Sequence, residues 1–529
     1  MPHNASRYSW SCVVLRSVFG LAIGTSIATL PAHSDNVKEH FDKGVALVKE
    51  QKLEAALEEF GLVRKDLPND PATLSYIGLI YLSRQKYTDA LDVLELAVKI
   101  KPDMAEAHLN LGNVYDRLKR YPDAMHEFQI AAHLQPGSSD AYYDLGGVYY
   151  EMKRLPEAVT AYQKAATLAP NDAEVMANLG FALEASDKLS TAISAYRRAT
   201  TLAPQNVVYW QNLGNALQTQ ARRVQIASSV KTPGSAVPGS NKSAAIVAAW
   251  NQARLALVRA VQLAPDDYTV REALGETLYE MGQNQEAGAQ FVKATELKPG
   301  EFTPHYYLGL AQLNLDRLPG AAASLRRALE ITPGDKDALR WLGFAQYKQG
   351  KYADAAATYA QLTKAAPDDM AAWTNLGAAL QQKGDEATAA AVLEEALKNG
   401  GSGKQVAPLR RTVAFYYFSK GDPESLKRAH EEYTLSLRDG PDSPDGYNGL
   451  GLVEQKQGLL DDSIDALKHA VALNPRYANA YNNLGVVYVL KGSMDQAVAS
   501  YRKALESDPS NTLAKQNLAR INAQAGLKK

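Results

Sequence analysis

At 529 residues the chain is too long to fold around one compact core, so it must be divided into domains or repeats. Its 57 lysine and arginine side chains balance 58 acidic ones, which gives no electrostatic case for a nucleic-acid or anionic-membrane partner. The only cysteine, Cys12, lies in the N-terminal leader, so the mature chain is expected to have no disulfide, thiol nucleophile or thiolate metal site.

The leader at 1–34 has the pattern of a secretory signal peptide. Arg7 and Arg16 are its only formally charged side chains, and an apolar run at 18–30 precedes the sequence PAHSD. We expect cleavage after Ser34, with an uncleaved anchor as the alternative, although the run is short for a membrane-spanning helix. With or without cleavage, the positively charged N-terminal end of the leader favours export of the residues that follow it. We therefore expect a periplasmic or secreted protein, with the bacterial envelope preferred, and no stable membrane insertion after cleavage.

Glycine recurs at one constant spacing after the leader, as the step from Gly78 to Gly112 illustrates, and an alanine and then a proline follow each glycine at fixed offsets. The step from Gly214 to Gly275 is longer because it contains an insertion. Two steps between Gly377 and Gly451 each contain three extra residues, with Ala414 in the glycine role. Thirteen repeats result, over about residues 37–511. The structural repeat glycines are Gly44, Gly78, Gly112, Gly146, Gly180, Gly214, Gly275, Gly309, Gly343, Gly377, Gly451 and Gly485.

Each repeat has the pattern of two helices joined by a turn. In the third repeat apolar residues follow helical spacing in two blocks, with a break at 119–123. Pro122 can begin the second helix and Pro136 can end it. A glycine in mid-helix costs about 1 kcal/mol relative to alanine. Gly112 therefore indicates close helix packing, with bulky residues such as Phe128 filling the remaining space.

The residue types at these repeated positions, taken together, resemble those of the tetratricopeptide repeat. The last repeat shows them as Tyr481, Leu484, Gly485, Tyr488, Ala497, Tyr501, Ala504 and Pro509. This resemblance implies an all-α, right-handed α-solenoid of about 13 helix–turn–helix repeats. The implied organisation is a leader at 1–34, repeats one to five at 35–206, repeat six at 207–267, repeats seven to ten at 268–403, repeats eleven to thirteen at 404–511 and a capping helix at 512–529.

Two segments depart from the repeat. Residues 218–245 are rich in serine, glycine and proline and basic without an acid, which predicts a flexible loop between the helices of repeat six. The alternative is a tether that contacts an acidic partner or lipid headgroups. The sequence NGGSGK at 399–404 is not a phosphate loop, because Lys398 and Gln405 stand where glycine and Ser or Thr are required. We expect a helix stop there.

No motif predicts catalysis, and we expect no enzyme activity, no metal and no cofactor. His108, His126 and His133 share the third repeat, but they occupy packing or solvated slots without an accompanying carboxylate pattern. Acidic pairs such as Asp266 with Asp267 and Asp368 with Asp369 are expected to cap helices.

Binding is the expected activity. The position two before the repeat glycine holds asparagine in five repeats, and an amide both donates and accepts hydrogen bonds, as an extended peptide requires. This column resembles the asparagine ladder of the tetratricopeptide-repeat superhelix of O-GlcNAc transferase, which implies that it lines a concave groove. The alternative is that these amides only solvate the groove. The candidate ligand-binding residues are Asn110, Asn178, Asn212, Asn375 and Asn483.

The sequence thus predicts an exported, non-enzymatic scaffold or adaptor whose groove binds a protein or extended peptide, with no nucleic-acid partner. The alternative is an accessory subunit that organises an envelope enzyme, such as a glycosyltransferase or a polysaccharide-assembly complex. A neighbouring gene for such an enzyme would favour the alternative.

Overall fold

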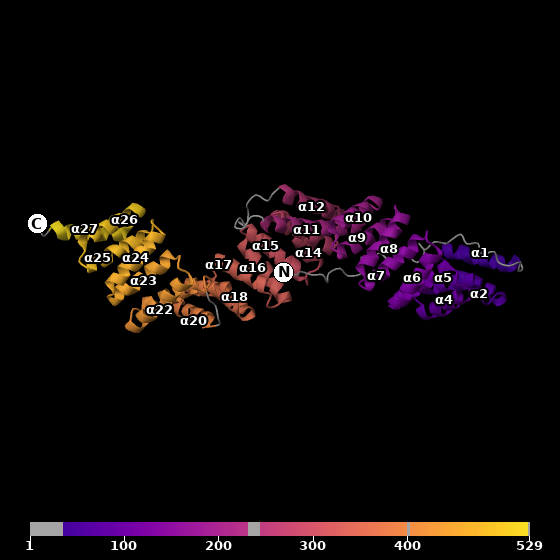
Figure 1. Ribbon diagram of the computed structural model, residues 1–529, viewed down its shortest axis with the longest axis horizontal. Coiled ribbons are helices and arrows are strands. Elements are labelled where there is room, and N and C mark those ends of the chain that lie inside the picture. The colour runs from indigo at the N-terminus through magenta and orange to yellow at the C-terminus, as the bar shows by residue number, and fades with distance from the viewer. Residues whose placement is uncertain (1–34, 231–243, 399–402, 527–529) are drawn as a thin grey trace. The chain divides into compact units, whose positions relative to one another are not determined.

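The computed structural model describes residues 35–230, 244–398 and 403–526, so the expected leader and most of the sequence NGGSGK lie outside the described residues. Within these ranges the chain forms 27 helices and no strand, as the repeat pattern predicts (Figure 1). Helices α1 to α26 are thirteen consecutive pairs, and α27 follows them. Their bounds are α1 Asp35–Lys49, α2 Leu53–Asp66, α3 Pro71–Ser83, α4 Tyr87–Ile100, α5 Ala105–Arg117, α6 Tyr121–Leu134, α7 Ser139–Glu151, α8 Leu155–Leu168, α9 Ala173–Ala185, α10 Leu189–Leu202, α11 Val207–Val230, α12 Ala244–Leu263, α13 Tyr268–Glu280, α14 Asn284–Leu297, α15 Phe302–Asn314, α16 Leu318–Ile331, α17 Lys336–Lys348, α18 Tyr352–Ala365, α19 Met370–Gln382, α20 Glu386–Lys398, α21 Ala407–Lys420, α22 Pro423–Asp439, α23 Pro444–Gln457, α24 Leu460–Leu473, α25 Ala478–Leu490, α26 Met494–Ser507 and α27 Thr512–Gly526.

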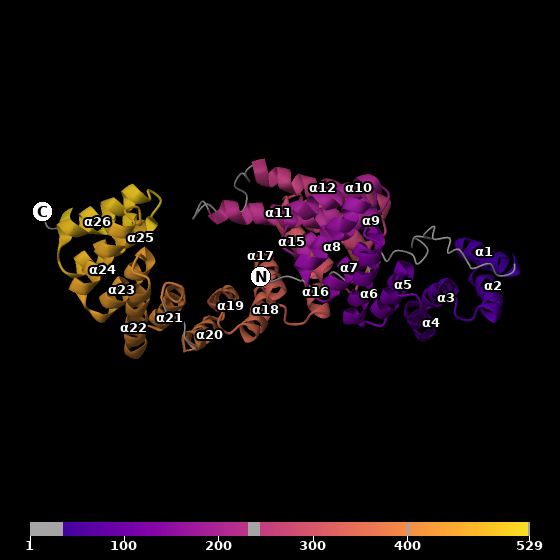
Figure 2. The same cartoon turned by 45° about the vertical axis from the view of Figure 1, so that its right-hand side comes forward.

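The helices form two compact units, divided at Gly282. We call them the N-terminal array (α1 to α13) and the C-terminal array (α14 to α27). Inside each array a helix packs against the next one along the chain, so successive hairpins lie side by side (Figure 2). The stacking makes each repeat depend mainly on its neighbours, as in other solenoids.

Within each array the repeat glycines lie where the two helices of one hairpin touch, as predicted. A Cβ atom on Gly112 would come within 2.6 Å of the Phe128 ring, and one on Gly343 within 2.7 Å of the Tyr359 ring. The same relationship joins Gly44 to Phe60 and Gly485 to Tyr501. In each case the bulky residue stands at the same offset after the glycine and fills the space that the missing side chain leaves.

In twelve of the thirteen repeats the turn inside the hairpin contains a residue with left-handed backbone seven positions after the repeat glycine or its substitute. Glycine occupies that position in six repeats, whereas Gln51, Gln85, Lys119, Lys153, Asp187 and Asp316 adopt it with φ between 55° and 61°. A side chain in this conformation costs free energy, because its Cβ approaches the following carbonyl oxygen. Repeat six has no such residue among those described, because its first helix continues through the position.

Prolines and aspartates define the helix ends largely as expected. Pro122 lies in the first turn of α6, and α6 ends at Leu134, before Pro136. Asp267 caps α13 by accepting from the backbone N–H groups of Thr269 and Val270, and Asp369 caps α19 in the same way.

The carbonyl group of the repeat proline also has a recurring side-chain partner. Six positions later, on the next first helix, a side-chain nitrogen lies 2.5–3.1 Å from that carbonyl oxygen in five repeats. The pairs are His108 with Pro102, Trp210 with Pro204, Arg271 with Pro265, His305 with Pro299 and Trp373 with Pro367. These contacts fasten the linker between hairpins to the following helix.

Repeat six differs from the flexible loop predicted for 218–245. Helix α11 has 24 residues and continues to Val230, and α12 has 20 residues and begins at Ala244, so only residues 231–243 of that segment lie outside the described chain. Residues 218–230 contain no glycine or proline, and nothing in them stops a helix. Trp250 is fully buried between the lengthened helices and donates to Gln225 Oε1 at 3.1 Å.

The basic residues of that segment that are described form ion pairs within the N-terminal array. Arg222 pairs with Glu276 at 3.2 Å, and Arg223 pairs with Asp187. The prediction of a flexible loop is therefore wrong for residues 218–230, which are helical.

Repeat eleven absorbs three additional residues as helix. Helix α22 has 17 residues where most other second helices have 13 or 14, and it brings Asp439 to Arg410 of α21. The Arg410 guanidinium lies 2.9 Å from Glu432 and 2.9 Å from Asp439, and all three side chains are nearly buried. This buried ion triad, Arg410 with Glu432 and Asp439, holds α21 on α22.

Helix α27 packs on the last hairpin. Its Ile521 is buried in a cluster with Leu484, Val487 and Tyr501, and Leu518 packs against the same cluster. The position of α27 is the one that a terminal cap requires.

Candidate binding site

The five predicted asparagines all lie on first helices, but their amides differ in burial and bonding. In the N-terminal array Asn110 and Asn178 are only 7% and 6% exposed. Their Nδ2 groups donate to the preceding repeat, Asn110 to Ser75 Oγ at 3.3 Å and Asn178 to Tyr143 Oη at 2.7 Å. These two amides therefore also hold one repeat to the next.

The other three asparagines are half-buried. Asn212 lies on α11, Asn375 on α19 and Asn483 on α25. The Asn483 Nδ2 donates to Asn448 Oδ1 at 2.9 Å, again one repeat back along the chain. Ligand binding by the five amides stays a prediction.

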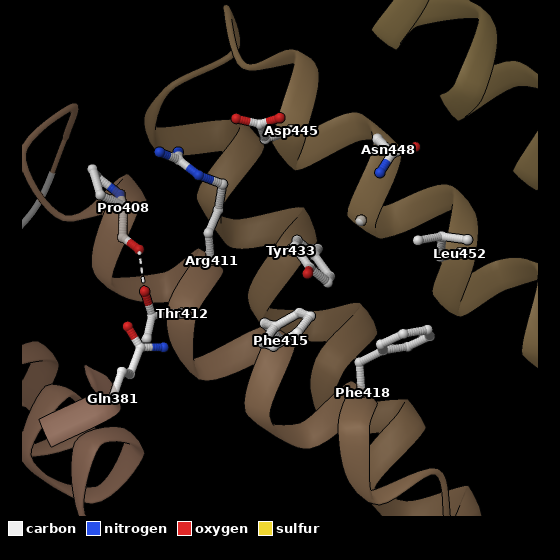
Figure 3. A pocket seen from close by; sticks show the side chains of 11 residues that line it. Gln381, Pro408, Arg411, Thr412, Phe415, Phe418, Tyr433, Asp445, Asn448 and Leu452 are labelled. Atoms are coloured by element: carbon white, nitrogen blue, oxygen red, sulfur yellow. Dashed lines mark hydrogen bonds between the residues drawn. The ribbon is translucent and has the colours of Figure 1, made fainter. Parts of the chain in front are cut away.

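A pocket of about 400 Å³ lies in the C-terminal array, where α19, α21, α22 and α23 meet (Figure 3). Its floor consists of rings and an aliphatic side chain, namely Phe415, Phe418, Tyr433 and Leu452. Its polar rim consists of Gln381, Arg411, Thr412, Asp445 and Asn448, and Pro408 and Gly449 complete the lining. An apolar cavity with a few polar groups at its edge is the usual form of a small binding site.

Gly449 explains why the Tyr433 ring can line the pocket. It stands two positions before Gly451, the position that holds asparagine in other repeats, and a Cβ atom there would lie 2.7 Å from Tyr433 Oη. The Tyr433 side chain, 5% exposed, thus occupies the space that a longer residue would take.

The polar rim combines a cation with a partly engaged carboxylate. Among the described residues Arg411 has no carboxylate within ion-pair distance, in contrast to its neighbour Arg410. Asp445 accepts a hydrogen bond from Tyr477 Oη at 2.7 Å. Burial raises the pKa of Tyr433 to about 12, so the phenol stays neutral at physiological pH.

The asparagine pattern alone did not point to this pocket. Three signals in the sequence mark its position: the two three-residue insertions, Ala414 in place of glycine, and Gly449 in the asparagine position. Such departures from the repeat indicate where the surface of the solenoid differs from that of the other repeats. They do not show which side chains line the pocket.

The described residues contain no group of three or more His, Cys, Asp or Glu side chains placed to hold a metal ion. His108 has a structural environment: its Nδ1 lies 2.6 Å from Glu127 Oε2 and its Nε2 lies 3.0 Å from Pro102 O. None of the helices that the structure describes is long and apolar enough to cross a membrane.

Helix pairs that stack one after another along the chain define the class of α-solenoid repeat proteins. The pocket lies largely on the first helices of these pairs. A family model described as the tetratricopeptide repeat matches residues 109–173, 143–207, 273–336, 342–404 and 448–512, more than half of the chain. A second model, described as the TPR repeat, matches residues 78–119. The chain belongs to the tetratricopeptide-repeat family.

Solved structures with similar repeats include the Cut9–Hcn1 hetero-tetramer of the APC/C, at 15% identity over 93% of this chain and 97% of that one, with a TM-score of 0.33. Yeast Tom70 is similar at 15% identity over 80% and 96%, with a TM-score of 0.32. MamA from Desulfovibrio magneticus RS-1 is similar at 25% identity over 32% and 97%, with a TM-score of 0.30. No curated protein matches the sequence.

Proposed function

We propose that this protein is an exported, non-enzymatic adaptor that binds a segment of another protein on its first helices. Tetratricopeptide repeats generally mediate protein–protein interactions, and the observation that carries the proposal here is the pocket around Gly449. Its rings and aliphatic floor can accept a side chain, while its rim amides can bond to the backbone of an extended segment.

Rigid first helices position the pocket. Thr412 on α21 donates to Pro408 O at 3.3 Å, and Asn448 on α23 is held by Asn483 of the next repeat. A site built on packed helices loses little conformational entropy when it binds, which favours affinity.

The proposal is tested by a photo-crosslinking amino acid at position 415 of the full-length chain, in its native compartment. Phe415 is 51% exposed at the pocket, and Leu473, 44% exposed on the second helix α24, is the matched control position. We expect position 415 to capture a defined polypeptide that position 473 does not. Equal capture at both positions, or none at 415, would contradict binding at this site.

Export is tested on the same preparation. We expect the mature chain to begin at Asp35 and to fractionate with periplasmic or secreted proteins. A cytoplasmic chain that retains residues 1–34 would contradict export. If the captured polypeptide is an exported glycosyltransferase or another envelope enzyme, the adaptor is its accessory subunit.

A further inference from the structure

The residues that line the pocket around Gly449 indicate which kind of protein segment it can bind. Its apolar part is larger than a methyl or hydroxyl group can fill. Phe415 is 51% exposed, and the rings of Phe418 and Tyr433 and the side chain of Leu452 also face the space (Figure 3). A volume of about 400 Å³ suits one large aromatic or aliphatic side chain together with part of its backbone.

The rim presents one guanidinium, that of Arg411, which forms no ion pair with the described residues. Arg411 is half-buried at the edge of the pocket, and none of the described carboxylates lies within ion-pair distance of it. Its neighbour Arg410 is fully engaged with Glu432 and Asp439, so the difference does not come from a lack of acids in this repeat. A planar guanidinium without a partner is well suited to bind a carboxylate with two hydrogen bonds.

The remaining rim groups suit a peptide backbone better than further charges. Asp445 already accepts from Tyr477, and it would repel a second ligand carboxylate placed on its side. The Asn448 Oδ1 accepts from Asn483, so the group that Asn448 can offer a ligand is the Nδ2 donor, which suits a backbone carbonyl. Because Gly449 has no side chain, the Tyr433 ring packs directly against α23 and forms part of the pocket lining.

We infer that this pocket binds a protein segment in which a large apolar side chain stands next to a single Glu or Asp. The apolar side chain lies on Phe415, Phe418 and Leu452, and the carboxylate pairs with Arg411. This inference rests on the proposed function and specifies the ligand of the same site.

Fluorescence anisotropy of the full-length mature chain with fluorescein-labelled nonapeptides tests it. The peptides share a Gly-Ser background and differ in two central residues: Phe-Glu, Phe-Gln, Ala-Glu and Phe-Lys. We expect Phe-Glu to bind about tenfold more tightly than Phe-Gln or Ala-Glu, and Phe-Lys to bind weakest. Binding of all four peptides within twofold, or no binding of Phe-Glu, would overturn the inference.

Variants separate the two contacts. Arg411→Gln should remove the preference for Phe-Glu over Phe-Gln, and Arg411→Lys should restore part of it. Phe415→Ala should remove the preference for Phe-Glu over Ala-Glu. The exposed Arg502 is the matched control, and Arg502→Gln should leave all four affinities unchanged. If Arg411→Gln keeps the preference for glutamate, Arg411 does not read the carboxylate and the inference fails.

The outcome is distinguishable from failure of the proposed function. Crosslinking at position 415 can capture a partner whose contacting segment has no apolar–acidic pair. In that case the adaptor function stands and only the ligand class is wrong.

Discussion

Gly112 lies directly against the ring of Phe128, so close that a Cβ atom on the glycine would come within 2.6 Å of the ring carbon Cε1. Phe128 itself is 1% exposed and fixed in the core, which leaves the ring little room to move away. The period of the sequence is therefore a packing requirement: one residue per repeat must be glycine or, as at Ala414, no larger than alanine.

The first prediction concerns that contact. Gly112→Ala should lower the free energy of unfolding by about 1–3 kcal/mol through overpacking, although alanine alone would favour the helix by about 1 kcal/mol. Gly61→Ala in helix α2 is the matched control and should stabilise by about 1 kcal/mol, because no atom lies within 4 Å of a Cβ placed there. Urea denaturation followed by circular dichroism measures both. If Gly112→Ala left the free energy of unfolding unchanged, the Phe128 ring would have to move aside, contrary to this prediction.

The second prediction concerns the turns. Gln85 has φ of 60° in a position that glycine occupies in six other repeats. Gln85→Gly should stabilise the hairpin by about 0.5–1 kcal/mol, because relief of the left-handed strain exceeds the added entropy of the unfolded chain. In the opposite direction Gly492→Ala, at φ of 79°, should destabilise its hairpin by about 1 kcal/mol. Thermal and urea unfolding of the two variants should shift in opposite senses.

The third prediction compares two neighbouring arginines. Arg410→Ala leaves Glu432 and Asp439, with side chains only 4% and 8% exposed, without their main cation and should cost about 3 kcal/mol. Arg411→Ala should change stability by less than about 0.5 kcal/mol, because Arg411 has no ion pair with the described residues. Amide hydrogen exchange over residues 407–439 localises the loss, since a long repeat array need not unfold in one step. Equal costs for the two variants would contradict the assignment of the triad.

The fourth prediction is a pH dependence at Glu454 on α23. Burial, followed by repulsion from Asp462 and Asp465 on α24, raises the pKa of this carboxyl to about 7. Its Oε2 atom is buried without a hydrogen-bond partner, and Oε1 lies 3.4 Å from His430 Nε2 on α22. The folded state therefore holds a proton that the unfolded state releases near pH 4.5, so stability falls as the pH rises from about 4.5 to 7.

Replacing the carboxyl should remove that loss. Glu454→Gln should match the wild type near pH 4 and be about 1–3 kcal/mol more stable at pH 8. The exposed Glu395 provides the control, and Glu395→Gln should not change the pH profile. Parallel denaturation profiles of wild type and Glu454→Gln between pH 4 and 8 would exclude the ionisation of Glu454 as the cause.

The regular part of the fold could be predicted because each repeat imposes the same local demands. The spacing from Gly112 to Pro136 predicted both helices of the third hairpin, and the same spacing predicted the others. The lengthened helices of repeat six were missed because the residues after Gln218 break the repeat without breaking helix periodicity. There the pairing of Trp250 with Gln225 depends on a tertiary contact that no local pattern encodes.

The candidate site was harder to predict for a related reason. The pocket joins Arg411 of one repeat to Gly449 of the next, and its shape depends on Tyr433 from the helix between them. Comparison of equivalent repeat positions shows that Gly449 lacks the side chain that other repeats have there. It does not show that Tyr433 fills the space beside it. Likewise, the asparagine pattern did not reveal that the amides of Asn110 and Asn178 already bind the preceding repeat.

The insertion in repeat six leaves the glycine contact between its two helices unchanged. A Cβ on Gly214 would meet Leu257, which stands much further along the chain than the usual partner, yet the glycine-to-leucine contact is the same as that between Gly377 and Leu393. The added residues thus lengthen α11 and α12 beyond this contact, towards the end of the hairpin where the chain passes from α11 to α12. That end is a natural attachment point: a fluorescent or affinity domain inserted there would mark the protein internally without altering the spacing of its repeats.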